Sequence, residues 1–192
     1  MKVLIACEYS GIVRDAFLRA GHDAMSCDIL PTESPGPHYQ GNVMDILHDG
    51  WDLMVGHPPC TYFTNAGNRW YWEDSTVCTK EERWKRFYQA VDFWRMLWNA
   101  PIERIALENP EPSKYAAHFI GKPNDKVQPY HYGHKETKGI CLWLKNLPPL
   151  MSTMMMEEPE PLVHFASPGE DRAKIRSRFY EGIAAAMVHQ WQ

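Results

Sequence analysis

The sequence predicts an α/β fold built on a mostly parallel sheet with helices on both faces. Short apolar runs of strand type alternate along the chain with stretches of helical periodicity. The first unit has the order strand, glycine, helix, strand, acidic residue, which is the order of a nucleotide-binding half of a doubly wound sheet. Two later apolar runs end in polar residues beside prolines. Open α/β sheets keep their sites at the carboxyl ends of the strands, so we expect the functional residues there.

The amino-terminal unit predicts a site for a nucleotide-type cofactor. Residues 2–7 form an apolar run, Gly11 opens a helical stretch that Gly21 ends, and a second strand runs to Asp28. In this order Asp28 would accept hydrogen bonds from ribose hydroxyls, and the next acid, Asp45, would lie near an adenine.

The third strand-like run, residues 51–55, leads into Gly56-His57-Pro58-Pro59-Cys60. The prolines fix φ and remove two backbone donors, so this segment cannot simply continue the sheet. A cysteine held rigidly at the end of a strand is placed for attack on a substrate. The alternative is a turn with an incidental buried cysteine, because free cysteine often behaves as a small hydrophobe.

A fourth run, residues 102–107, ends in Glu108-Asn109-Pro110. The proline restricts the backbone of the residue before it. A carboxylate at the carboxyl end of this strand lies where α/β sheets hold their active sites, so the tips of two strands could bring Cys60 and Glu108 into one pocket.

These two motifs, in this order, resemble those of the DNA (cytosine-5) methyltransferases. That family has a Pro-Pro-Cys loop followed by Phe-Ser-x-Ala-Gly, and later Glu-Asn-Val or Glu-Asn-Pro. Residues 58–67 here read Pro-Pro-Cys-Thr-Tyr-Phe-Thr-Asn-Ala-Gly. The resemblance spans nearly the whole chain. It implies a Rossmann-like S-adenosylmethionine-dependent methyltransferase fold and methyl transfer to carbon 5 of cytosine in DNA.

The resemblance also implies a role for each residue of the two motifs. Cytosine carbon 5 is a poor nucleophile, and addition of the Cys60 thiolate to carbon 6 would activate it by covalent catalysis. Glu108 would hold ring nitrogen N3, which requires a protonated carboxyl group. Asn109 would help orient the loop that carries Cys60.

The first motif of the family, Phe-x-Gly-x-Gly before a helix that ends in Ala-Gly, matches at Gly11 and at Ala20-Gly21. Cys7 stands in place of the phenylalanine, and Tyr9 stands in place of the first glycine. The residues that the resemblance assigns to S-adenosylmethionine are Cys7, Glu8, Tyr9, Gly11, Asp28, Asp45 and Pro58.

A third segment, residues 132–140, lies where the family has Tyr-Gly-x-Pro-Gln-x-Arg-x-Arg before a strand. Lys138 falls on the first arginine and Ile140 on the second. We therefore assign the basic contact to the cytosine to Lys138, with Lys135 or Arg178 as alternatives. The strand would cover residues 140–144, and residues 180–187 resemble the last helical motif of the family.

The family usually inserts a target-recognition domain after this basic motif, whereas residues 147–171 read as a surface connection. We therefore expect one catalytic domain over residues 1–192 that reads duplex sequence only with a protein partner. DNA is the expected substrate, and single-stranded DNA, RNA and a free cytidine nucleotide stay open. A modified methyl donor stays open too.

A protein that only binds cofactor or nucleic acid is the alternative from another class, motivated by Tyr9 and Ile140. A metal enzyme is not expected. His57 and Cys60 are three residues apart, as are His131 and His134, but zinc cytidine deaminases require Pro-Cys-x-x-Cys, which is absent from the sequence.

The five cysteines, an odd number with no Cys-x-x-Cys pair, favour a protein of the reducing cytoplasm. No apolar run in the sequence is long enough to span a membrane. With a net charge of −4, nucleic-acid contacts would have to come from local basic clusters. Two clusters could line DNA or form ordinary solvated faces: Lys80, Arg83, Lys85, Arg86 and Arg95, and Arg172, Lys174, Arg176 and Arg178. The helical spacing of Trp84, Phe87, Tyr88, Val91, Trp94 and Trp98 indicates core packing. The aromatic loop at residues 68–73 could instead cover a base.

Overall fold

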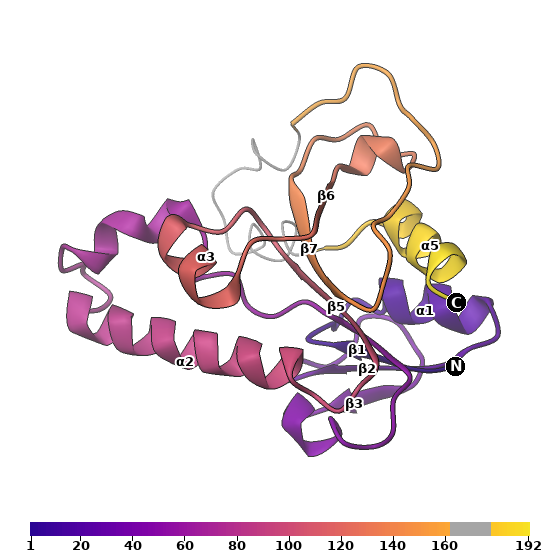
Figure 1. Ribbon diagram of the computed structural model, residues 1–192, viewed down its shortest axis with the longest axis horizontal. Helices are drawn as coiled ribbons and strands as arrows, with labels where there is room; N and C mark the ends of the chain where they lie inside the picture. The colour runs from indigo at the N-terminus through magenta and orange to yellow at the C-terminus, as the bar shows by residue number, and fades with distance from the viewer. Residues whose placement is uncertain (162–177) are drawn as a thin grey trace.

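A computed structural model describes residues 1–161 and 178–192 and contains one seven-stranded sheet (Figure 1). The strand order is β3-β2-β1-β4-β5-β7-β6, and β7 runs antiparallel to both of its neighbours. The other neighbouring pairs are parallel. The strands are β1 (Lys2–Ala6), β2 (Asp23–Asp28), β3 (His38–Gln40), β4 (Leu53–Gly56), β5 (Arg104–Asn109), β6 (Asp125–Val127) and β7 (Ile140–Lys145). The predicted Rossmann-like α/β fold is confirmed.

Helices cover both faces of the sheet. The helices α1 (Ile12–Arg19) and α5 (Glu181–Gln190) pack together on one face, and α2 (Lys80–Trp98) and α3 (Lys114–Ile120) lie on the other (Figure 1). Successive residues of a strand point to opposite faces. Accordingly, Val3 of β1 belongs to the core under α1 and α5, whereas Leu4 belongs to the core under α2 and α3. Because both faces are buried along β1, β4, β5 and β7, these four strands read as largely continuous apolar runs.

Side-chain caps fix where the two helices on the second face begin. The Thr79 hydroxyl accepts from the backbone N–H of Glu82 at the start of α2, and the Ser113 hydroxyl accepts from that of Ala116 at the start of α3. No helix in the described ranges has both the length and the apolar character needed to cross a membrane.

The aromatic stripe of α2 packs in the core at Phe87, Val91 and Trp94, as predicted. Tyr88 differs, with 49% of its surface exposed.

The expected strands are present with shifted ends. The run expected at residues 102–107 is β5, which starts later and includes Glu108 and Asn109. Trp51 lies outside β4, where its indole N–H donates to the carbonyl of Ile46 at 2.7 Å. Sequence periodicity did not predict β3 or β6, because each strand has only three residues.

Residues 147–161 are the described part of the expected surface connection. They run beside residues 130–137, with backbone bonds of 2.9 Å from Gly133 to Met154 and from Thr137 to Glu160. The rest of that connection, together with Arg172, Lys174 and Arg176 of the second basic cluster, lies outside the described residues.

Candidate active site

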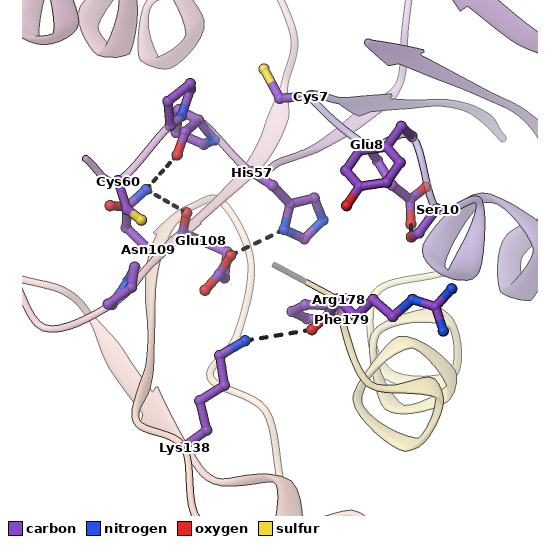
Figure 2. A pocket seen from close by; sticks show the side chains of 14 residues that line it. Cys7, Glu8, Ser10, His57, Cys60, Glu108, Asn109, Lys138, Arg178 and Phe179 are labelled. Carbon is purple, nitrogen blue, oxygen red and sulfur yellow. Dashed lines mark hydrogen bonds and ion pairs between the residues drawn. The ribbon is translucent and has the colours of Figure 1, made fainter. Parts of the chain in front are cut away.

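A cavity of about 160 Å³ lies at the carboxyl ends of β1, β4 and β5 (Figure 2). Eight of the eleven residues predicted for the site line it: Cys7, Glu8, Tyr9, Pro58, Cys60, Glu108, Asn109 and Lys138. The cavity is also lined by residues for which the sequence motifs predict no role, among them Ser10, His57 and Phe179. The structure thus brings together residues that are far apart in the sequence.

Cys60 sits in a loop that is anchored on both sides. The carbonyl of Cys60 accepts from the backbone N–H of Phe63 at 3.0 Å, which closes a turn directly after the cysteine. Phe63 is buried with its ring edge-on to Phe87 and Trp94, and its carbonyl accepts from the N–H of Ser113 at 2.6 Å. The loop is therefore fixed to the core on the α2 side of the sheet.

Asn109 ties the end of β5 to this loop. Its side-chain amide donates to the carbonyl of Pro58 at 2.7 Å and to the carbonyl of Glu108 at 3.0 Å (Figure 2). Only 1% of the Asn109 surface is exposed, so water does not compete for these bonds. The amide therefore sets the separation between the Cys60 loop and Glu108.

Glu108 forms a pair with His57. Atom Nδ1 of His57 lies 3.2 Å from Oε2 of Glu108, and both side chains are largely buried. The imidazole also packs on the ring of Phe179, with centroids 4.9 Å apart. From the sequence, the spacing of His57 and Cys60 suggests only a metal ligand, and that role is not expected. The one available signal was its position between a strand and two prolines.

Lys138 approaches the cavity from the segment before β7. Its ammonium group donates to the carbonyl of Arg178 at 3.4 Å and lies 5.4 Å from the centre of the Tyr180 ring. Arg178 also lines the cavity, whereas Lys135 is exposed elsewhere. Ile140 is completely buried in the core under α1 and α5, so its position offers no contact to a substrate.

Glu8 lines the cavity, but its carboxylate serves the fold. It accepts from the backbone N–H groups of Val13 at 2.7 Å and Arg14 at 3.2 Å, and from the Ser10 hydroxyl at 3.2 Å. These amides belong to the first turn of α1, so Glu8 caps that helix.

Cys7 is a poor candidate for a nucleophile. Burial, reinforced by the nearby Asp28 carboxylate, raises the pKa of its thiol to about 12. The thiol therefore stays protonated near neutral pH, and the reactive form of cysteine is the thiolate.

Three predicted cofactor residues, Gly11, Asp28 and Asp45, do not line this cavity. Gly11 has φ +77°, and a Cβ there would lie 2.5 Å from the Arg14 guanidinium, so glycine is required for packing. Asp45 accepts from the Tyr39 hydroxyl at 3.0 Å.

The end of β2 nevertheless fits a nucleoside. Asp28 presents a carboxylate there, and the next side chain, Ile29, is apolar and 76% exposed. An acceptor for ribose hydroxyls beside an uncovered apolar surface is the chemistry that a bound nucleoside requires.

Arg83, a member of the first basic cluster, is buried and packs within the protein. Arg83 is 9% exposed, and its guanidinium lies over the rings of Tyr62 and Tyr71 at 5.4 and 4.8 Å. Arg83 thus holds the loop after Cys60 and is not a free contact for DNA. In the aromatic loop, Tyr71 is buried and Trp72 is 60% exposed, so part of this loop packs down and part faces solvent.

No protein-family model matches the sequence, and no curated protein does. Among solved structures, the chain is similar to one described as a DNA modification methyltransferase encoded within a prophage of E. coli. The two share 16% sequence identity at a TM-score of 0.49. The match covers 86% of this chain and 55% of the other, so this chain spans little more than half the length of that protein.

Proposed function

We propose that this protein transfers a methyl group from S-adenosylmethionine to carbon 5 of cytosine in DNA, with Cys60 as a covalent nucleophile. The observation that carries the proposal is the meeting of Cys60 and Glu108 in one cavity. A thiol and a carboxyl group on neighbouring strand ends can act on the same pyrimidine ring, and the proposed chemistry requires both.

Cys60 would act first. Its thiolate forms a bond to carbon 6, and the π electrons of the C5–C6 double bond move to carbon 5, which becomes nucleophilic. After carbon 5 is methylated, a base removes the proton from this carbon. The electron pair of the broken C–H bond restores the double bond and expels the Cys60 sulfur.

Glu108 and Lys138 would stabilise the ring during this addition. Negative charge develops on the N3–C2–O2 side of the ring when sulfur attacks carbon 6. The protonated carboxyl group of Glu108 donates a hydrogen bond to N3, and the shared proton returns fully to Glu108 when the sulfur leaves. The ammonium group of Lys138 adds a positive charge at the same cavity.

S-adenosylmethionine, when bound, supplies the methyl group. Asp28 would accept from the ribose hydroxyls, Ile29 would cover one side of the adenine, and Asp45 would lie near its edge. Residues 7–10, which follow β1, form one wall of the cavity that contains Cys60. Glu8 would support this wall indirectly by capping α1.

DNA is the substrate that we propose, in single-stranded form or as a duplex presented by a partner protein. The segment between β7 and α5, residues 146–180, is short for a domain that reads duplex sequence. RNA and free cytidine nucleotides are outcomes that the experiment separates.

The test uses S-adenosylmethionine labelled with tritium on its methyl group. Duplex DNA, single-stranded DNA, transfer RNA, dCMP and dCTP are offered in turn to the native protein, to Cys60→Ser and to Cys78→Ser. Cys78 is a free, half-buried cysteine outside the cavity and makes a matched control. We expect label in the cytosine of DNA with the native protein and with Cys78→Ser, and none with Cys60→Ser.

Full transfer by Cys60→Ser would overturn the covalent mechanism. Binding of S-adenosylmethionine without transfer to any of these substrates would favour the alternative of a protein that only binds. Label in RNA or in a free nucleotide alone would keep the chemistry and change the substrate.

A further inference from the structure

His57 belongs to the cavity, yet the proposed chemistry leaves it without a role. It directly follows the last residue of β4, and its backbone N–H donates to the carbonyl of Ala6 at 2.9 Å. Two prolines follow it in the sequence. The backbone that carries the imidazole is therefore fixed on both sides.

The surroundings of the ring nitrogens indicate where the imidazole proton lies. Nδ1 faces Oε2 of Glu108 at 3.2 Å. Nε2 is buried and finds no hydrogen-bond partner within residues 1–161 and 178–192. A proton on Nε2 would be buried without an acceptor among these residues, so the hydrogen-bond geometry favours the tautomer that carries its proton on Nδ1. In this form Nδ1 donates to Oε2.

We propose that His57 is a positioning residue that orients Glu108 for the base. The donation from Nδ1 engages Oε2 and directs the other oxygen, Oε1, to N3 of the target cytosine. This inference rests on the proposed function. His57 itself touches neither the base nor the reacting carbon, so it acts through Glu108.

The contact with Phe179 completes the positioning. The phenyl ring lies 4.9 Å from the imidazole and comes from the segment that leads into α5. Figure 2 shows the imidazole between this ring and the end of β1. With its backbone, one ring nitrogen and one ring face engaged, His57 has little freedom to turn. It can therefore hold a carboxyl group that would otherwise rotate about its own side-chain bonds.

Three substitutions of His57 separate the donor atom at Nδ1 from the ring itself. Asparagine places its side-chain N–H close to where Nδ1 lies, so His57→Asn keeps the donation to Glu108. Glutamine carries its N–H one bond farther out, close to the place of Nε2, so His57→Gln loses the donation. Phenylalanine keeps the ring and its packing on Phe179 but has no donor. All three remove the titratable group.

The experiment measures methyl transfer to single-stranded and duplex DNA for these variants, with kcat and KM determined separately. We expect His57→Phe and His57→Gln to lower kcat on the order of tenfold to a hundredfold with little change in KM. His57→Asn should retain kcat within about threefold, because donation from one fixed atom is all that the role requires. In a Glu108→Ala background, His57→Phe should have no further effect.

Three results would overturn the inference. One is equal loss in His57→Asn and His57→Phe, which would show that the ring or its titration matters. Another is full kcat in His57→Phe. The third is an undiminished effect of His57→Phe when Glu108 is absent. If the native protein shows no methyl transfer that depends on Cys60, the proposed function itself is overturned, and so is this inference.

Discussion

Replacing Glu8 by glutamine should destabilise the protein by loosening the start of α1. The Glu8 carboxylate is 4% exposed and accepts three hydrogen bonds, two of them from backbone N–H groups of the first helical turn. Glutamine offers one acceptor oxygen and turns an NH₂ group toward a donor. A lost bond to a charged group is worth about 1.5–3 kcal/mol, and the negative charge at a helix N-terminus adds about 0.3–1 kcal/mol.

Removing a buried charge also removes its desolvation cost, which offsets part of this loss. We expect Glu8→Gln to lower the free energy of unfolding by about 2 kcal/mol and the Tm by about 4–8 °C for a chain of this size. Urea unfolding followed by circular dichroism measures the first quantity, and a thermal melt measures the second.

Glu181→Gln is the matched control, because Glu181 is an exposed carboxylate in the first turn of α5. It should change stability by no more than about 1 kcal/mol, because it loses only the charge effect at the helix N-terminus and no buried hydrogen bond. If Glu8→Gln proves as stable as Glu181→Gln, the Glu8 cap does not stabilise the start of α1. The assignment of Glu8 to the residues that bind the cofactor would then be favoured.

Three further predictions concern the supports of the site. Asn109→Ala should lower the free energy of unfolding by about 1–3 kcal/mol, because the carbonyl of Pro58 loses its buried donor. The same substitution should lower methyl transfer more than it lowers cofactor binding. Equal stability of the variant and the native protein in urea would contradict this prediction. Gly182→Ala would place a Cβ 1.9 Å from the carbonyl of Tyr132, so a drop in Tm of several degrees is expected, and an unchanged melt would show that this contact is not tight. The raised pKa of Cys7, about 12, means that the unfolded chain loses this proton near its ordinary value while the folded chain keeps it. The free energy of unfolding should therefore fall as the pH rises from about 9 to 12. Cys7→Ala should make this fall less steep by about 1.4 kcal/mol per pH unit. Identical slopes for the variant and the native protein would show that the Cys7 thiol does not cause the fall.

The parts of the fold that the sequence predicted are those with strong local signals. The apolar runs that became β1, β4, β5 and β7 are buried on both faces, so each is continuous and easy to recognise. The short strands β3 and β6 were not predicted, because they form through pairing with a neighbour and not through a periodicity of their own.

For the site, the sequence placed Cys60 and Glu108 at strand ends, and the topology then made them neighbours. It could not show that His57 pairs with Glu108, because the directions of these two side chains leave no pattern in the sequence. Nor could it show that Glu8 and Arg83 are engaged within the protein. Charged residues usually face solvent, and only the tertiary structure shows that these two are buried with partners.

The most direct measurement of the proposed chemistry uses DNA that contains 5-fluorocytosine. After methyl transfer, fluorine on carbon 5 cannot leave as the proton does, so the bond between sulfur and carbon 6 persists. The native protein and Cys78→Ser should each form a species of protein plus DNA that survives denaturing electrophoresis, and its formation should require S-adenosylmethionine. Peptide mapping should place the DNA on Cys60, and Cys60→Ser should form no such species. Methyl transfer to ordinary cytosine without any trapped species, or trapping that persists in Cys60→Ser, would contradict a covalent mechanism at Cys60.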